Sequence, residues 1–248
     1  MKGTRPLDNK EIRRVAACFD GTFAIRNRGL FMLGVSTGGR ISELLSLTIG
    51  DVYQNGKAIS DLLYDKSIVK GGEISRAVPV NADGRRAIAD LITWHREKYN
   101  TTHKNRPLFP SRNGQGNPQP MSRRTAHNAL KAAFETAGLN GHLATHSLRK
   151  SFAQRLYDRT GDIFAVQEML GHKSVATTQK YLGVNYANVR DALEEMSLDS
   201  ELLKSPLLGS SLKSTVSDET LFLELALRGY DLSKLRDTET TADIIKLG

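Results

Sequence analysis

The sequence predicts a mainly α-helical α+β domain, a multi-helical fold with one small antiparallel β-sheet. Most of the first 197 residues fall into stretches whose apolar side chains recur at the three- and four-residue spacing of amphipathic helices. One region instead shows short β-branched runs around a glycine turn, which is typical of a hairpin. Hydrophobic side chains make up 39% of the 248 residues, enough for a domain with a substantial core.

The N-terminal elements are predicted to be three helices. Asp8 followed by Glu11 has the spacing of a capping box at a helix start. A second helix is expected over about residues 24–35. Gly38-Gly39 interrupts the pattern, which resumes as a short helix over residues 40–47.

The predicted hairpin follows, and helices complete the chain. Strands at 67–69 and 77–80 flank Lys70-Gly71-Gly72, and residues 100–120 form a loop rich in Asn, Gly and Pro. The remaining helices are expected over residues 82–98, 122–137, 147–159, 163–170, 175–182 and 186–196.

Charge divides the chain into a basic body and an acidic tail. The whole sequence carries a net charge of +8. Residues 198–248 carry about −3 and residues 1–197 about +11, so a polyanionic partner is expected to bind the body. We predict a main domain over residues 1–197, and a linker with a helical tail over residues 198–248.

The sequence has few features of a disulfide-bonded, secreted or membrane-spanning protein. A single cysteine, Cys18, excludes an internal disulfide. The N-terminus has no apolar secretory core, and the longest apolar stretch, near residues 30–35, is too short to span a bilayer. A cytoplasmic protein without a membrane partner is therefore expected.

Two segments carry the polar side chains that phosphoryl transfer requires. They are TGGRISELLSL, from residue 37, and the pair THSLR and LGHKSVATTQKY, from residues 145 and 170. Phosphoryl transfer needs positive donors around the phosphate oxygens, and a guanidinium contacts two oxygens at once. Arg40 follows a glycine break at a helix start. Arg149 lies three residues after His146, so a helix places both on one face.

These segments resemble the tyrosine recombinases, the phage-integrase family, from about Asp8 to Met196. Six positions match the family's site in the family's order: Arg40, Lys70, His146, Arg149, His172 and Tyr181. Glu43 matches the supporting acidic residue after the first arginine. The resemblance implies a multi-helical tyrosine-recombinase-like catalytic domain that cleaves and rejoins DNA at specific sites.

The resemblance also implies a role for each side chain. Tyr181 attacks the scissile phosphate and forms a 3′-phosphotyrosine. Arg40 and Arg149 stabilise the charge on the phosphate oxygens. Lys70 protonates the departing 5′ oxygen, and the two histidines donate hydrogen bonds and assist proton transfer. The bond energy is conserved in the intermediate, so neither metal, ATP nor another cofactor is expected.

The implied partners are double-stranded DNA and further copies of the chain in a tetrameric synapse, with an association with the nucleoid. Family members usually carry a helical DNA-binding domain ahead of the first arginine, whereas 39 residues precede Arg40 here. An accessory DNA-bending or clamp protein is therefore a further candidate partner, and DNA binding by this chain alone is expected to be weak and largely non-specific.

Other interpretations of these residues stay open. A DNA-binding accessory protein with the recombinase fold but no strand exchange is the main alternative, and a type IB relaxing enzyme is another. Lys66 competes with Lys70 as the hairpin lysine. His142 and His146 have a zinc-compatible spacing, but no third ligand is evident.

Several further side chains have weaker signals. Arg123, Arg124 and Lys131 are candidate contacts to the DNA backbone, and an ordinary solvated helix face explains them equally well. We expect three histidines to lie at the surface: His95, His103 and His127. In the tail, residues 221–226 form an apolar stripe that is expected to pack on the body or on a neighbouring copy. A weakly ordered appendage is the alternative.

Overall fold

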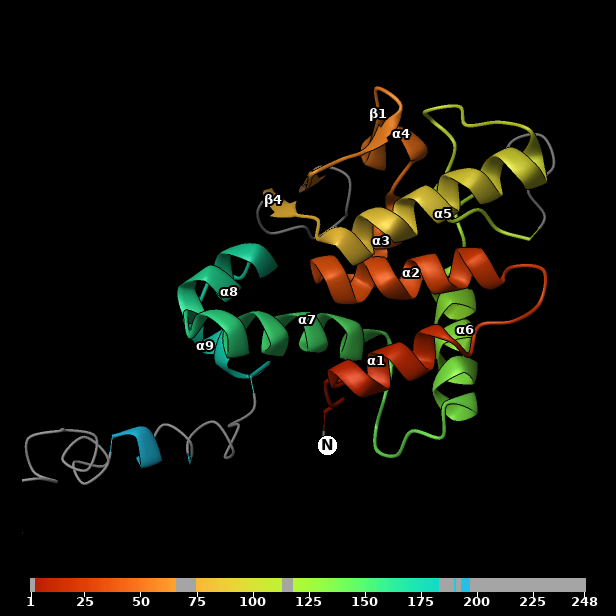
Figure 1. The fold of residues 1–248 in the computed structure, drawn as a ribbon. Helices are drawn as coiled ribbons and strands as arrows, with labels where there is room; N and C mark the ends of the chain where they lie inside the picture. Colours follow the sequence, from red (N-terminus) through yellow and green to blue (C-terminus); the bar gives the residue numbers. More distant parts are fainter. Residues whose placement is uncertain (1–2, 66–74, 113–117, 183–189, 191–192, 197–248) are drawn as a thin grey trace, which may run out of the picture. The chain divides into compact units, whose positions relative to one another are not determined.

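The computed structural model describes residues 3–65, 75–112, 118–182, 190 and 193–196. The chain divides into two units, Met1–Gly183 and Val184–Gly248. In the first unit the described helices are α1 (Asn9–Ala16), α2 (Ala24–Thr37), α3 (Ile41–Ser46), α4 (Ile49–Val52), α5 (Ala82–Tyr99), α6 (Arg123–Thr136), α7 (Thr145–Thr160), α8 (Ile163–Leu170) and α9 (Val175–Gln179) (Figure 1). Among the described residues, no helix is long and apolar enough to cross a membrane.

Side chains that satisfy the first backbone N–H groups begin several of these helices. The predicted capping box is confirmed, because Asp8 accepts from the backbone N–H of Glu11 at 2.7 Å and Glu11 accepts from that of Asp8 at 3.1 Å. At the start of α5 the side chain of Asn81 accepts from the backbone N–H of Gly84, and at the start of α6 that of Ser122 accepts from the N–H of Thr125. At its other end, α2 stops at Gly38, whose φ of 64° is left-handed.

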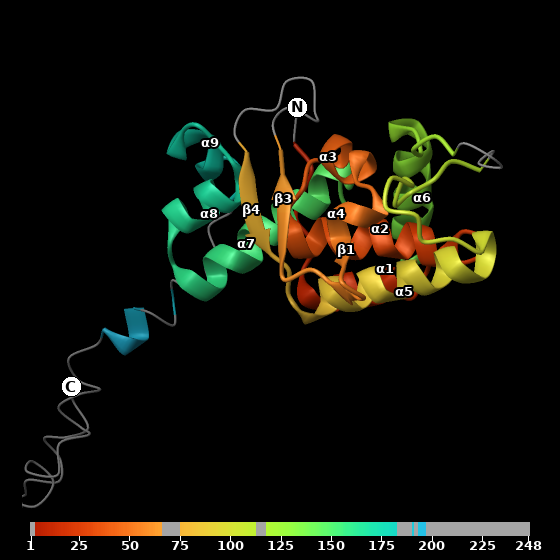
Figure 2. The same cartoon turned by 90° about the horizontal axis from the view of Figure 1, so that it is seen from above.

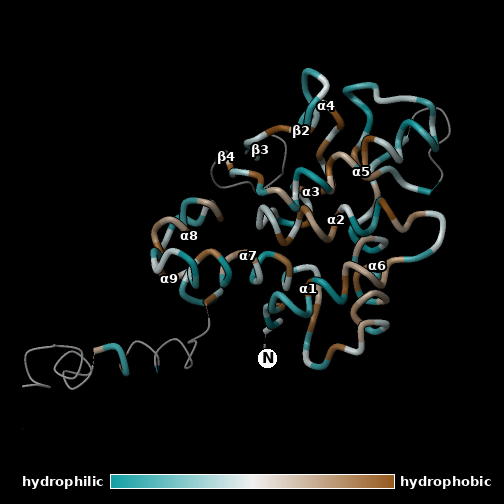
Figure 3. The backbone as a smooth tube through the Cα atoms, viewed as in Figure 1, coloured by the Kyte–Doolittle hydropathy of each residue, from teal (hydrophilic) through white to brown (hydrophobic). Residues whose placement is uncertain are grey.

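Helix α2 is the central element of the first unit. Its Leu30 and Leu33 belong to one core cluster, which also includes residues of α5, β3 and β4. Its Phe31 and Val35 belong to a second cluster with residues of α1 and α6. From Gly29 to Thr37 every residue of α2 except Met32 is buried, and Figure 3 shows hydrophobic colour along much of α2.

Two small antiparallel sheets lie beside this helical core. Strand β1 (Tyr53–Gln54) pairs with β2 (Lys57–Ala58), and β3 (Asp61–Tyr64) pairs with β4 (Arg76–Pro79), with Leu62 opposite Val78 and Tyr64 opposite Arg76. Figure 2 shows β3 and β4 side by side next to α8. The predicted mainly helical α+β architecture is thus confirmed, with a second two-stranded sheet that was not predicted.

The structure changes three sequence-based expectations and leaves one untested. The expected strand at 67–69, with Lys70, lies outside the described residues, and β4 pairs with β3. Helix α7 begins at Thr145, so His146 lies in its first turn. Helix α9 ends at Gln179, so the expected helix to residue 182 is too long. His95 is fully buried rather than exposed, because it lies on the inner face of α5 and hydrogen-bonds the carbonyl of Leu108 at 3.0 Å.

The C-terminal expectations are largely outside the described residues. Of the helix predicted over 186–196, residue 190 and residues 193–195 are helical. The expected linker, the helix after Asp218 and the apolar stripe at 221–226 all lie outside the described residues.

Candidate active site

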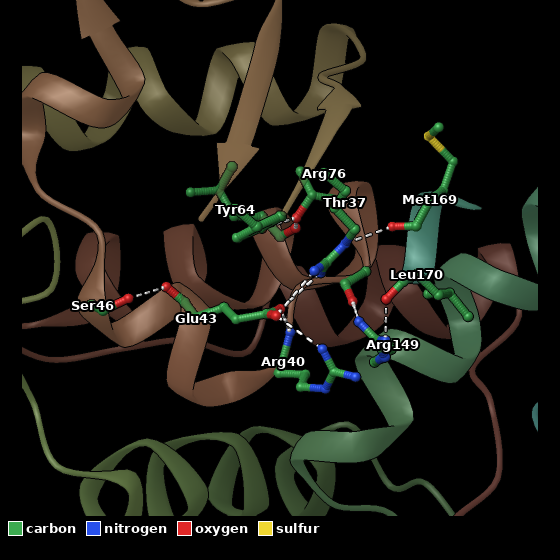
Figure 4. A network of polar contacts seen from close by, with 11 residues as sticks. Thr37, Arg40, Glu43, Ser46, Tyr64, Arg76, Arg149, Met169 and Leu170 are labelled. Carbon is green, nitrogen blue, oxygen red and sulfur yellow. Dashed lines mark hydrogen bonds and ion pairs between the residues drawn. The ribbon is translucent and has the colours of Figure 1, made fainter. Parts of the chain in front are cut away.

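Arg149 occupies the centre of the site. Its side chain projects from α7 and is 1% exposed. Its Nη1 donates to the carbonyl of Gly38 at 2.6 Å, and its Nη2 donates to the carbonyl of Leu170 at 2.5 Å (Figure 4). These carbonyls lie two residues before Arg40 and His172, respectively. Arg149 therefore ties the end of α2 to the end of α8, and so holds two predicted site residues near each other.

Arg149 also retains an unsatisfied donor. Its Nε is buried and has no hydrogen-bond partner among the described residues. Burial, followed by the charges of Arg40 and Arg76, lowers the pKa of Arg149 to about 10, so the guanidinium is still positively charged at neutral pH. A buried N–H of a charged group is costly when unpaired. The centre of the site thus offers a fixed positive donor to an anion.

A buried carboxylate joins two further arginines. Glu43, in the first turn of α3, is 5% exposed. It accepts from the backbone N–H of Arg40 at 2.6 Å and from Nη1 of Arg40 at 3.0 Å. Arg76 reaches the same carboxylate from β4 with two bonds, of 3.0 and 2.8 Å (Figure 4). The pair fixes Arg40 at the N-terminus of α3.

The electrostatic balance keeps Glu43 ionised. Burial alone raises the pKa of this carboxyl. The hydrogen bonds and charge of Arg76, together with the backbone N–H and charge of Arg40, outweigh that effect and lower the pKa to about 2. A buried charge pair of this kind is stable only with good geometry and further hydrogen bonds, and both are present here.

Tyr181 lies close to two histidines. Its Oη is 2.7 Å from Nε2 of His146, and the two rings are 5.6 Å apart. The ring of His172 lies 4.9 Å from the Tyr181 ring, and its Nδ1 is 3.0 Å from Oγ1 of Thr178. The guanidinium of Arg149 lies 5.9 Å from the Tyr181 ring centre.

Both histidines favour the neutral form. Desolvation by the surrounding protein, followed by the positive charges of Arg149, Lys150 and Arg40, lowers the pKa of His146. Desolvation and the charges of Arg149, Arg40 and Arg76 lower the pKa of His172 to about 4. Neutral imidazoles can accept a proton, so the ring nitrogen of His146 beside Tyr181 is suited to act as a base.

The structure therefore brings together most of the side chains that the sequence singled out. The residues that meet are Arg40, Glu43, His146, Arg149, His172 and Tyr181. Lys70 and Lys66 lie outside the described residues. Arg123, Arg124 and Lys131 are exposed on α6, where Lys131 lies 3.6 Å from Glu135. No group of three or more His, Cys, Asp or Glu side chains with metal-binding geometry occurs in the part of the chain that the structure describes.

Sequence reasoning missed Arg76. Its signal was the alternation of β4 and the residue that follows it, in which Val78 and Val80 are buried and Arg76 occupies the same face. An arginine at a core-facing strand position indicates a buried partner. The sequence alone does not say that the partner is Glu43.

Comparison with known proteins gives a consistent result. The model of the phage integrase family matches residues 5–188. Among curated proteins, the chain is 33% identical over 167 residues to tyrosine recombinase XerD of Corynebacterium glutamicum, covering 67% of this chain and 51% of that protein. It is 34% identical over 190 residues to tyrosine recombinase XerC of Xanthomonas campestris pv. campestris, covering 75% and 54%. The chain thus spans about half the length of the curated relatives it matches.

Solved structures agree with this assignment. The XerH site-specific recombinase, in a post-cleavage complex with a palindromic difH substrate, matches with a TM-score of 0.62 and 28% identity, covering 78% of this chain and 53% of that one. A lambda integrase dimer bound to a core site, at 21% identity and a TM-score of 0.53, shares the fold. The arginines, histidines and tyrosine assembled here and the family match over most of the chain lead to one conclusion: the chain belongs to the phage integrase family and contains a tyrosine recombinase catalytic domain.

Proposed function

We propose that this chain is the catalytic part of a site-specific DNA recombinase that breaks and rejoins DNA through a covalent bond to Tyr181. The observation that carries the proposal is the 2.7 Å contact between Oη of Tyr181 and Nε2 of His146, beside the charged Arg149. A tyrosine with an adjacent neutral base and a positive anion site has the parts of an activated nucleophile.

The proposed side chains account for every bond and proton of the cleavage step. Tyr181 Oη attacks the scissile phosphorus, and its proton passes to Nε2 of His146. A P–Oη bond forms as the P–O5′ bond breaks, which leaves a 3′-phosphotyrosine and a free 5′ hydroxyl. We assign the proton for the 5′ oxygen to Lys70, which follows β3 and precedes β4 in the sequence. Rejoining reverses these steps with a 5′ hydroxyl from another strand.

Arg40 and Arg149 are the proposed ligands of the phosphate oxygens. Two of the nitrogens of Arg149 hold backbone carbonyls, and its buried Nε has no protein partner among the described residues. A phosphate oxygen would satisfy that donor. Preorganised donors of this kind stabilise charge that develops in the transition state. His172, held by Thr178, is proposed to donate or accept a hydrogen bond at the same phosphate.

The partners follow from charge and from the likeness to XerH, whose structure contains a bound DNA substrate. We propose double-stranded DNA as the substrate of the basic body at residues 1–197, with backbone contacts from Arg123, Arg124 and Lys131. Strand exchange between two sites requires four active sites, so we propose self-association on DNA. An accessory clamp or DNA-bending protein is a further proposed partner. A DNA substrate would place the protein at the nucleoid, and residues 198–248 are assigned to a linker and tail.

A nicked DNA duplex tests the proposal. The protein is mixed with end-labelled nicked duplexes from its genomic neighbourhood, because loss of the short fragment traps the covalent intermediate. We expect a labelled adduct that resists denaturing detergent. Tyr181→Phe should bind DNA as the unchanged protein does and form no adduct. Binding without an adduct from the unchanged protein would favour the accessory function, and an adduct from Tyr181→Phe would refute the assignment of the nucleophile.

Two further arms separate the remaining alternatives. Exchange of flanking DNA between two duplexes distinguishes recombination from relaxation by a type IB enzyme. Adduct formation in EDTA should equal that without it, since no step of the proposed reaction uses a metal. A loss of adduct in EDTA, restored by added zinc, would instead support a metal-dependent reaction.

A further inference from the structure

We propose that Arg76 is a positioning residue for cleavage, whose single guanidinium orients both the phosphate-binding Arg40 and the turn that presents His172. The inference rests on the proposed function for its kinetic test, but its structural test is independent of cleavage. Arg76 contacts no reacting atom in this assignment, and it acts through Glu43 and through the end of α8.

All three guanidinium nitrogens of Arg76 have fixed partners. Nη1 and Nη2 bind the two oxygens of Glu43 at 3.0 and 2.8 Å, and Nε donates to the carbonyl of Met169 at 2.8 Å (Figure 4). The guanidinium also lies over the ring of Tyr64, 4.6 Å from its centre. The side chain is 3% exposed. A planar fork with every nitrogen engaged allows one orientation only.

The first branch of this network leads to Arg40. The carboxylate that Arg76 grips is also the acceptor for the backbone N–H and for Nη1 of Arg40, at 2.6 and 3.0 Å. Two parallel bonds from Arg76 set the rotation of the Glu43 carboxylate. That carboxylate in turn holds Arg40. Loss of Arg76 would therefore let the carboxylate rotate, and the orientation of the Arg40 guanidinium would be less fixed.

The second branch leads to His172. Met169 and Leu170 end α8, and their carbonyls are bound by Arg76 and Arg149, respectively. Gly171 follows with a left-handed φ of 63°, and a Cβ at this position would lie 3.0 Å from Cδ of Arg76. Arg76 therefore packs directly on the turn that places His172 beside Tyr181.

A third connection reaches the hairpin itself. Arg76 begins β4 and pairs across the sheet with Tyr64, whose Oη is 2.7 Å from Oγ1 of Thr37, which in turn donates to the carbonyl of Leu33. The ends of the two strands that flank Lys70 in the sequence are thus fastened to the arginine site. A side chain that meets α3, α8 and the sheet at one point is well placed to set their relative positions.

Arg26 provides a matched control. It is likewise buried, at 1% exposed, and its guanidinium also binds a backbone carbonyl, of Pro110 at 2.6 Å, and an oxygen of Asn27. None of these partners belongs to the site. Replacing either arginine removes a buried charge with fixed partners, but only Arg76 is connected to Arg40 and His172.

The kinetic test measures single-turnover cleavage of nicked DNA well below the melting temperature of every variant, with DNA affinity measured in the Tyr181→Phe background. We expect Arg76→Gln to lower the cleavage rate about 10²-fold, a loss comparable with that of a transition-state donor, with little change in affinity. Arg76→Lys should recover part of the rate. Arg26→Gln should lower stability while cleaving at close to the unchanged rate, because none of its partners belongs to the site. Equal losses for Arg26→Gln and Arg76→Gln, or full activity of Arg76→Gln, would show that Arg76 has no positioning role.

The pH dependence of the cleavage rate provides a second measurement, which a purely structural role of Arg76 would not change. Among the residues that the structure describes, the charged and titratable groups around Glu43 are Arg40, Arg76, Arg149 and Tyr64. Without Arg76, burial is opposed mainly by Arg40, so the pKa of Glu43 rises. Arg76→Gln should therefore lose additional activity as pH falls from about 7 to about 5, and Glu43→Gln/Arg76→Gln should lack that extra loss. A profile of Arg76→Gln parallel to that of the unchanged protein would contradict the branch through Glu43.

Nuclear magnetic resonance of side-chain nitrogens tests the positioning role of Arg76 separately from the proposed DNA cleavage. In protein without DNA, Arg76→Gln should shift or broaden the Arg40 guanidinium and His172 ring signals, whereas Arg26→Gln should leave them in place. If the unchanged protein forms no adduct, the proposed function fails, and these spectra alone decide the role of Arg76. Unchanged Arg40 and His172 signals in folded Arg76→Gln and Arg76→Lys would overturn the inference.

Discussion

Oη of Tyr181 lies 2.7 Å from Nε2 of His146, although the two residues are 35 positions apart in the sequence. His146 lies in the first turn of α7, and Tyr181 follows the end of α9. Glycines with left-handed φ values end α7 and α8, at Gly161 and Gly171, and let the chain turn back on itself. The contact therefore exists only when α7, α8 and α9 are all folded.

Replacing His146 should slow cleavage without abolishing DNA binding. His146→Gln keeps a hydrogen-bonding group but cannot take the phenolic proton, so we expect a loss of about 10²- to 10⁴-fold in the single-turnover rate. Because the pKa of His146 is lowered, the unchanged protein should stay active below the ordinary histidine range and lose rate only as acid protonates the ring. His103→Gln, at an exposed position, is the control. An unchanged rate in His146→Gln would transfer the role of base to another group.

Replacing Arg40 or Arg149 should slow cleavage to a similar extent, but the two replacements should affect the stability of the protein differently. Replacement of either by Met should reduce cleavage by about 10²-fold or more. Arg149→Met also leaves the buried carbonyls of Gly38 and Leu170 without their donor, at about 1–3 kcal/mol for each. The side chain of Arg40 is 28% exposed, so the free energy of unfolding of Arg40→Met should be close to that of the unchanged protein. Urea unfolding and single-turnover cleavage check both parts, and equal stability of the two variants would contradict the buried role of Arg149.

His172 should make stability depend on pH. Its pKa is about 4 in the folded protein, against 6.5 ordinarily, so the unfolded chain binds the proton first as pH falls. The contribution of His172 to the free energy of unfolding should therefore decrease from about pH 6.5 to about pH 4, by about 3 kcal/mol. Urea unfolding at stepped pH measures this. His172→Gln should make the curve less steep between these two pH values, and His127→Gln, at the surface, should not. An equally steep curve for His172→Gln and the unchanged protein would contradict the lowered pKa of His172.

Gly38 should tolerate no side chain. Gly38 and Gly161 have φ values of 64° and 65°, so alanine strains both by about 1–2 kcal/mol. At Gly38, a Cβ would also collide with the Phe152 ring, whereas at Gly161 it meets nothing within 4 Å. Overpacking should cost Gly38→Ala a further amount of about 1–3 kcal/mol, and displacing the carbonyl bound by Arg149 should lower cleavage. The melting temperatures and cleavage rates of Gly38→Ala and Gly161→Ala test this prediction. Equal behaviour would mean that only backbone strain matters.

Local features were predictable because the residues that determine them lie close together in the chain. The capping box at Asp8, the cap at Ser122 and the range of α8 follow from spacing over a few positions. The shared helix face of His146 and Arg149 also follows from spacing. The family follows from residues in a fixed order, which needs no knowledge of distance. Lys70 and the contacts of Arg123, Arg124 and Lys131 stay predictions.

Tertiary packing decided the rest, since burial depends on elements far apart in the sequence. His95 has an ordinary surface composition around it, yet α5 turns it inward onto Leu108. Helix α9 ends before Tyr181, and Tyr181 and Leu182 pack instead on a small apolar cluster of α7 and α8. Arg76 is buried only because Glu43, 33 residues earlier, neutralises it. A sequence pattern records which side chains a helix or strand presents, whereas a charge can be buried only where another element supplies its partner.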